Sequence, residues 1–455
     1  MTNNKLNESN VRKLIWKMGL PMIISMVLQA IYNVIDTIFV INSGAGADGN
    51  LALTAAFPIQ ILIIAVGVGT GVGINAMISK SLGKGDNQAV NKTAGNGIIL
   101  AIIIYVIFML FGVFLAKPYM RMMSRNEVVI ELGTTYLRIC CILSLGSIGY
   151  TVYERFLQAT GRTFFSMISQ VSGAVINIIL DAVFVLGLKF DVAGAAWATI
   201  IGQFVSLFIA MFFHYGFNKE INNQISYLKP DKNIIKSIYK IGLPAAIMQG
   251  LLAVMMFLVI QVLGLIKDDN LNQLMTGSFG IYYKIMQLAL FAAFGLSNTL
   301  ITISSFSVGL HDKERLKSCI KYGIINTLIV MICITIAFEA LASPLASLFG
   351  MSIIGDEKDK IISTCKIALR LSSLGYAFMG ISVAIQGILQ GCGSIFKPII
   401  ISVLRLVIFV IPIEILFILI SNDNIIYSFW IIFPIAELLT TIASIILLKT
   451  DKSLK

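Results

Sequence analysis

Charged residues are scarce in this sequence. Only 13% of its 455 residues are Asp, Glu, Lys or Arg, and 57% are hydrophobic. A typical soluble domain carries about 25% charged residues. A compact soluble protein always leaves a large surface facing water, and this composition has too few polar residues to cover one. The scarcity excludes a soluble fold and indicates a protein whose body lies in lipid.

The residues of metal and redox sites are also few. The two histidines, His214 and His311, are far apart, and none of the six cysteines forms a C-x-x-C pair. A histidine-based metal site or catalytic dyad is therefore not expected, and we predict no enzyme and no cofactor. Residues 44–49 match G-x-G-x-x-G, but no strand precedes them, as a dinucleotide site would require. The rival hypothesis is a membrane enzyme such as a prenyltransferase, with a metal site at Asp268-Asp269. The sequence has no second acidic motif to complete such a site.

Long apolar runs, in contrast, recur along the whole chain. A helix needs roughly 20 apolar residues to cross a hydrocarbon core about 30 Å thick. Twelve runs meet that length, and an even number places both termini on one side. The expected spans are residues 14–41, 52–81, 93–116, 133–158, 164–188, 193–217, 237–265, 275–309, 319–343, 361–390, 397–420 and 425–448.

Basic residues set the expected orientation. They are more frequent on the termini side, counting Arg155 and Arg162 around the end of the fourth span and four lysines in residues 218–236. Cytoplasmic loops carry the excess of Lys and Arg, so both termini are predicted cytoplasmic in a plasma-membrane protein. Topology also accounts for the net charge of +11 without a nucleic-acid partner.

The chain repeats itself. We expect a first half at residues 1–217, a cytoplasmic linker at 218–236 and a second half at 237–455. Six spans per half make the repeat parallel, as in two-lobed transporters with a central site. Four echoes occur in the same order, at shifts of 223, 226, 226 and 232 residues: Gly19-Leu20-Pro21 with Gly242-Leu243-Pro244, Leu115-Ala116 with Leu341-Ala342, Gly83 and Asp86 with Gly309 and Asp312, and Leu157-Gln158 with Leu389-Gln390.

Polar residues inside the first-half spans fall into stripes, because their spacing returns them to one helical face. Such stripes avoid lipid by facing one another or a wet cavity. The first span carries Gln29, Tyr32, Asn33 and Asp36, the fourth carries Ser147, Tyr150, Glu154 and Gln158, and the fifth carries Gln170, Gly173, Asn177 and Asp181.

Two acids on separate helices give the stripes a possible chemistry. Burial favours the protonated form of a carboxylate, so such a group can take up and release a proton. Carboxylate and amide oxygens can instead hold Na⁺. We expect Asp36, Asn33, Asn177 and Asp181 to form this cation site; simple hydrogen bonding between helices is the plainer interpretation.

The second half offers no central carboxylate. Its conspicuous charges are Lys284 and Arg405, and its methionines could line an adaptable apolar pocket. The expected substrate-binding residues are drawn from both halves: Gln29, Tyr32, Glu154, Gln158, Gln170, Gln249, Lys284 and Met286.

These motifs resemble the multidrug and toxic compound extrusion (MATE) family over essentially the whole chain. The resemblance implies an all-α membrane protein whose twelve helices form two six-helix lobes around a central cavity. It also implies export of small amphipathic, often cationic, compounds in exchange for H⁺ or Na⁺, by a protein we expect to be a monomer in the lipid bilayer. The motifs are Gly19-Leu20-Pro21, Tyr32-Asn33-Val34-Ile35-Asp36, Gly83-Lys84-Gly85-Asp86, Tyr136-Leu137-Arg138, Phe156-Leu157-Gln158-Ala159-Thr160-Gly161, Asn177-Ile178-Ile179-Leu180-Asp181, Gly280-Ile281-Tyr282-Tyr283-Lys284 and Gly295-Leu296-Ser297-Asn298.

By motif, Asp36, Asn177 and Asp181 match the first-lobe cation site of one prokaryotic branch of that family, where Na⁺ would be the only metal expected. Gln249 stands in the region where another branch keeps a carboxylate. The alternative is a lipid-linked oligosaccharide flippase of a related family, which should present a cavity rich in Arg and Lys.

Overall fold

The computed structural model describes residues 5–41, 46–349, 358–420 and 425–451. Within these ranges every regular element is a helix. Ten helices are long and apolar enough to cross a membrane, and two bent pairs bring the number to 12 if each pair is one span. The predicted twelve-helix membrane fold is confirmed.

The first half contains short 3-10 turns and the helices of six spans. A π-helical segment, η2, interrupts the third span, and another, η3, ends the fifth. The elements are η1 (Lys5–Asn7), α1 (Val11–Ile41), α2 (Gly46–Lys84), α3 (Asn87–Leu110), η2 (Phe111–Leu115), α4 (Ala116–Met123), α5 (Glu127–Ile142), α6 (Leu145–Ala159), α7 (Thr163–Asp181), η3 (Ala182–Gly187) and α8 (Asp191–Phe217), followed by η4 (Ile225–Tyr227) in the connection.

The second half has the same order of spans. Its π-helical segment, η6, lies within the eleventh span, whereas η3 ends the fifth. The elements are α9 (Lys232–Leu263), α10 (Asp269–Leu310), α11 (Lys313–Phe349), α12 (Lys358–Ser373), α13 (Tyr376–Gly391), α14 (Phe396–Val403), η6 (Leu404–Ile408), α15 (Val410–Ile420) and α16 (Ile425–Lys449).

Backbone geometry repeats along with the sequence. Gly161 and Gly393, each at the end of an echoed motif, have φ of 76° and 85°. These positive angles favour glycine, which has no Cβ. Gly85 and His311, 226 residues apart, are likewise left-handed, with φ of 72° and 58°. The fourth and tenth spans are both bent, by 41° between α5 and α6 and by 55° between α12 and α13. The parallel repeat is therefore visible in the fold.

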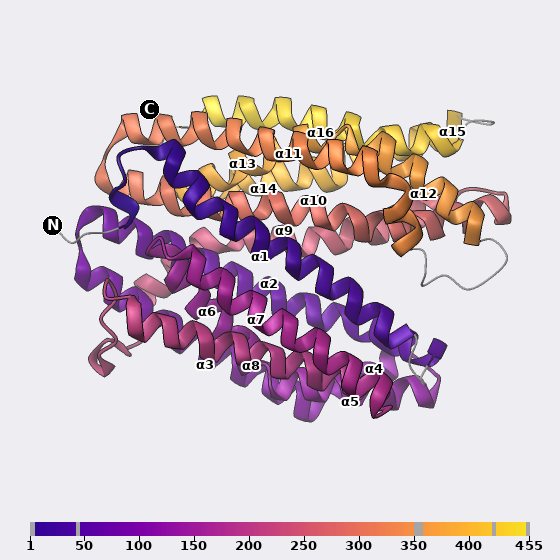
Figure 1. Ribbon diagram of the computed structural model, residues 1–455, viewed down its shortest axis with the longest axis horizontal. Coiled ribbons are helices and arrows are strands. Elements are labelled where there is room, and N and C mark those ends of the chain that lie inside the picture. The colour runs from indigo at the N-terminus through magenta and orange to yellow at the C-terminus, as the bar shows by residue number, and fades with distance from the viewer. Residues whose placement is uncertain (1–4, 42–45, 350–357, 421–424, 452–455) are drawn as a thin grey trace.

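The halves meet at one end of the bundle. α1 and α2 of the first half pack against α9 and α10 of the second, and the start of α1 and the end of α16 lie at the same end (Figure 1). We call this the termini end. Helices of the two halves diverge toward the opposite end (Figure 1).

Glycines allow the close approach at the termini end. Gly69 and Gly73 lie one turn apart on α2 and face Gly242 and Ile238 of α9, while Gly83 faces Gly309 of α10. A Cβ at any of these glycines would lie too close to atoms of the facing helix, and these are often backbone atoms. The alternating glycines of the second span therefore serve close helix packing, as small residues do in membranes. We call these contacts the glycine seam.

One hydrogen-bonded pair crosses the seam. Nδ2 of Asn75 on α2 donates to Oγ1 of Thr302 on α10 at 3.0 Å, and that oxygen lies 3.1 Å from Oδ1 of Asn75. Both side chains are buried. The pair fixes the register of α2 against α10.

Gly242→Ala should destabilise the seam, because the new methyl group would overlap the carbonyl oxygen of Gly69. Overpacking of this kind costs about 1–3 kcal/mol. Equilibrium unfolding in mixed micelles measures the change. The matched control is Gly250→Ala on the same helix, where the added Cβ meets open space; it should be neutral or stabilising. Equal destabilisation of both variants would contradict the seam.

Candidate functional site

Five helices of the described chain surround a polar cavity in the first half. α1, α7 and α8 supply the amides and α6 supplies the charged pair, while α2 closes one side with small and apolar residues. Five predicted residues line the cavity: Gln29, Tyr32, Glu154, Gln170 and Asn177. The stripes predicted from helical spacing thus face one cavity, which we call the first-half cavity.

Hydrogen bonds between amides tie α1 to α7. Nε2 of Gln170 donates to Oε1 of Gln29 at 2.6 Å. The hydroxyl of Ser25 donates to Oε1 of Gln170. Gln29 and Gln170 therefore satisfy polar atoms of their side chains through bonds between α1 and α7, because lipid offers no hydrogen-bond partner.

The charged pair Glu154 and Arg155 is bridged by Gln158. Oε1 of Gln158 accepts from Nη1 of Arg155 at 2.8 Å, and its Nε2 donates to Oε1 of Glu154 at 2.8 Å. Ser166 of α7 donates to the same carboxylate oxygen at 3.4 Å. All four residues are buried. One amide therefore contacts opposite charges on the same helix.

Arg155 is the site residue that sequence reasoning missed. Counted among loop residues for orientation, it is only 2% exposed and lies within α6. Its chain passes beside Gly71, where a Cβ would lie 2.9 Å from Cγ of Arg155. The signal that could have located it is this pairing of a glycine on one span with a long side chain on another, which needs the packing partner to be known.

The predicted cation site is described in part. Asn177 lines the cavity; its Nδ2 donates weakly to Thr199 at 3.5 Å, and its Oδ1 has no hydrogen-bond partner among the described residues. Asp181 is fully buried one turn further along α7, directly before η3. The side chains of Asn33 and Asp36 lie outside the described residues. The oxygen of Asn177 is thus an available acceptor for Na⁺ or water.

A second cavity lies between the two halves, and we call it the central cavity. Apolar and aromatic residues dominate its wall, together with Gln249 of the predicted substrate-binding set and several other amides. Arg155 is the one charged side chain among its lining residues in the described part of the chain. The central cavity adjoins the first-half cavity, and the two share five lining residues: Met26, Gln29, Ile64, Val68 and Arg155.

The glycine seam lies between the central cavity and the termini end. On α2 the cavity wall runs from Phe57 to Val72, and the seam continues to Gly83. On α9 the seam glycine Gly242 precedes Ala245, the first lining residue of that helix. The cavity is therefore closed by backbone contact on the termini side.

Three predicted substrate-binding residues lie elsewhere. Gln158 hydrogen-bonds Arg155 and Glu154 but lines neither the first-half cavity nor the central cavity. Met286 lines a smaller cavity inside the second half. Lys284, partly buried on α10, lines neither the first-half cavity, the central cavity nor the smaller cavity beside Met286. The structure thus brings Gln29 and Gln249 to one central cavity but separates Met286 and Lys284 from it.

Two repeated halves around a central cavity define the fold of a two-lobed membrane transporter. The family model MatE matches residues 21–183 and again residues 244–416, which together make up more than half of the chain. The chain belongs to the MatE family. The two matches begin at Pro21 and Pro244, separated by the same 223 residues as the first sequence echo.

Curated relatives share most of this length. The multidrug export protein MepA of Staphylococcus saprophyticus subsp. saprophyticus is 24% identical over 395 residues, 85% of this chain and 83% of that protein. MepA of Staphylococcus haemolyticus is 26% identical over 395 residues, with the same coverage. The outward-facing conformation of a multidrug resistance MATE family transporter of the MOP superfamily matches with a TM-score of 0.91 at 23% identity, covering 99% of this chain and 97% of that chain. At that identity the likeness shows the fold.

Gln158→Met should destabilise the protein markedly, because it removes the amide between Glu154 and Arg155. A buried group left without its hydrogen bond costs about 1–3 kcal/mol, and a charged group costs more. Unfolding in mixed micelles measures the loss. The control is Gln203→Met: Gln203 of α8 lines the first-half cavity, but its Oε1 has no hydrogen-bond partner among the described residues. Equal effects of the two changes would show that the bridge contributes little.

Proposed function

We propose that this protein exports small amphipathic, often cationic, organic compounds in exchange for H⁺ or Na⁺ by alternating access. It would act as a monomer in the plasma membrane, with both termini in the cytoplasm. The printed function of the MepA relatives, multidrug export, supports the substrate class. No covalent chemistry is required of the protein, so we propose a transporter and not an enzyme.

One observation carries the proposal: a polar cavity with a buried acid adjoins a largely apolar cavity between the halves. The apolar walls of the central cavity suit the carbon skeleton of an amphipathic compound, and its amides suit varied polar groups. Met248, Phe291 and Phe294 supply adaptable apolar surface there. The first-half cavity offers oxygen atoms that suit a proton or Na⁺.

The shared wall gives a physical route for exchange. Met26 and Gln29 of α1 and Arg155 of α6 contact both cavities. A cation bound near Asn177 and Asp181 would therefore change residues that also contact the compound. Repulsion between two cations sharing one buried region would further disfavour simultaneous occupancy, which is the requirement for exchange.

Alternating access would open and close the glycine seam. With the termini in the cytoplasm, the described state is closed toward the cytoplasm and would release compounds outward. The match to an outward-facing transporter supports this assignment. Rigid rocking of two repeats about a central site is the usual route in such folds.

The flippase alternative needs several cations to hold a diphosphate. Arg155 is the single cationic residue lining the central cavity within the described ranges, and Gln158 links it to Glu154. A doubly charged headgroup would find too little compensation there. Drug export is the better-supported function.

Loss of ethidium efflux from Asp36→Asn and Asp181→Asn is the expected result, because amides cannot carry the exchanging charge. The assay uses bacteria lacking their own efflux pumps, with protonophore or Na⁺ removal to identify the ion. Immunoblots of membranes show whether each variant is present. Glu314→Gln, at an exposed acid in the second half, is the control and should transport normally.

Unchanged efflux in both aspartate variants would reduce the first-half stripe to helix packing. Absence of efflux from the wild type, across several cationic dyes, would contradict multidrug export and favour a narrower substrate or the flippase.

A further inference from the structure

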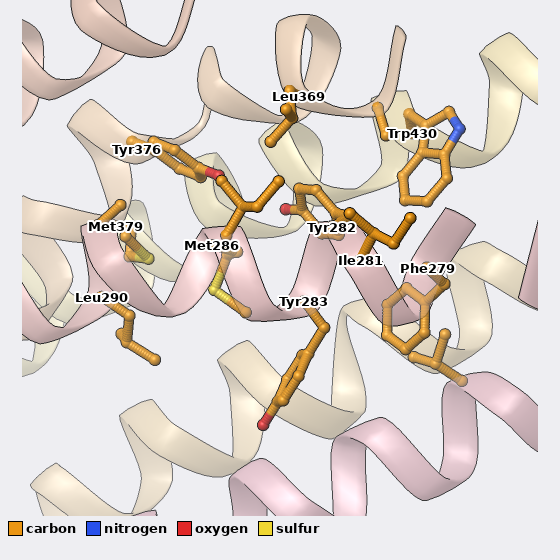
Figure 2. Close-up of a cluster of buried hydrophobic side chains, with 14 of the residues drawn as sticks. Phe279, Ile281, Tyr282, Tyr283, Met286, Leu290, Leu369, Tyr376, Met379 and Trp430 are labelled. Carbon is orange, nitrogen blue, oxygen red and sulfur yellow. The ribbon is translucent and has the colours of Figure 1, made fainter. Parts of the chain in front are cut away.

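A charged cluster lies inside the second half, separate from the first-half cavity. It surrounds a cavity of about 40 Å³, enough for a few water molecules, since one needs roughly 10–15 Å³. Figure 2 shows part of the wall, where the hydroxyl groups of Tyr282 and Tyr376 turn toward each other near Met286. Arg405 and Glu437 are the charged residues of this wall.

These two charges are close but incompletely satisfied. Nε of Arg405 lies 3.9 Å from Oε1 of Glu437, which is too long for a hydrogen bond. Nη1 of Arg405 and Oε2 of Glu437 have no hydrogen-bond partner among the described residues. The side chain of Arg405 is 3% exposed and that of Glu437 is 16% exposed. A purely structural ion pair would gain from closing this gap and using these atoms.

The backbone around Arg405 departs from the α-helix. Arg405 lies in η6, where the amide of Phe409 donates to the carbonyl of Leu404 at 2.9 Å, five residues back. π turns are rare and occur frequently at functional sites. The turn places Arg405 toward α16 and the cavity, in a span that α14 and α15 otherwise continue as α-helix.

We propose that Arg405 and Glu437 form a proton-exchange site of the second half, occupied by a proton and cavity water. A hydronium ion in the cavity would transfer its proton to Oε2 of Glu437 and leave a water molecule. The new O–H bond makes the acid neutral and leaves Arg405 without its counter-charge. Loss of the proton restores the opposite charges and draws η6 toward α16.

Other titratable groups surround this pair. Tyr282 and Tyr376 line the same cavity as Arg405 and Glu437. Cys365 lies on α12 and Glu414 on α15, both of which pack against α16. Glu414 is the competing candidate for any buried-acid signal, because its two carboxylate oxygens also have no hydrogen-bond partner among the described residues.

The cavity beside Arg405 and Glu437 shares one lining residue with the central cavity. Leu252 of α9 lines both. A shift of this side chain would connect the proton site to the compound in the central cavity. The coupling role of the site therefore rests on the proposed export function, whereas proton binding at Glu437 does not.

Infrared spectroscopy of the purified full-length chain tests proton binding directly. Spectra recorded across a pH series show the C=O stretch of a carboxylic acid only when the acid is neutral. We expect the titrating carboxyl signal of the wild type to contain one component that disappears in Glu437→Gln. That component should also disappear in the double variant Arg405→Gln/Glu437→Gln and persist in Glu414→Gln.

The double variant guards against misfolding. Removing Glu437 alone leaves a buried arginine uncompensated, whereas removing both charges keeps the net charge of the pair at zero. Its thermal unfolding midpoint shows whether it is folded. If the difference spectrum of wild type minus folded double variant contains no titrating carboxyl component, the proposal is overturned. A signal lost only in Glu414→Gln overturns it too and moves the proton to α15.

Transport in proteoliposomes tests coupling. With an imposed pH difference, ethidium flux through the wild type should accelerate, and flux through the double variant should lose that acceleration. Retained acceleration in the double variant would contradict a coupling role. Because the infrared test needs no transport, a chain that moves no dye would contradict the export function while the carboxyl signal still decides this site.

Discussion

The bilayer core supplies no water to satisfy polar side chains, so each polar group in the membrane-spanning body needs a partner inside the protein. The first half meets this constraint by turning stripes of amides and charges toward one another. Gln170 bonds Gln29 across α1 and α7, and Gln158 joins Glu154 to Arg155 on α6. These bonds also position the helices around a polar cavity. The same hydrogen bonds therefore satisfy the buried polar groups and build the site.

The contact between halves follows a different principle. The glycine seam depends on backbone approach, which glycine permits at Gly69, Gly73 and Gly242. Dispersion at such contacts is short-ranged, so a small separation of the helices forfeits much of it. Separating the two helices also exposes few charged groups, so the cost of desolvating them when the seam closes again is small. A seam of this kind suits a contact that must form and break repeatedly as a unit.

Helical spacing predicted which faces of α1, α6 and α7 meet, because lipid forces polar residues such as Gln29, Gln170 and Asn177 inward. The sequence echoes likewise predicted the repeat that appears in the left-handed turns at Gly161 and Gly393. Spacing could not identify the partner of each face. Arg155 was misplaced for that reason: an arginine near a span end fits a loop equally well, and only α2, through Gly71, makes room for it inside.

The π segments show a second limit of sequence-based prediction. A π turn adds one residue to a helical turn without an evident signature, so neither η3 nor η6 could be read from periodicity. Both nevertheless occur in equivalent spans, with Asp181 directly before η3 and Arg405 within η6. An α-helix fixes the direction of every side chain, whereas the extra residue of a π turn lets the flanking residues rotate as the turn shifts. The two segments do not correspond residue for residue, because the 232-residue shift of the neighbouring echo places Arg405 opposite Gly173 and Asp181 opposite Ile413. The charge beside each π segment is therefore a feature of its own half, and the repeat in sequence did not predict it.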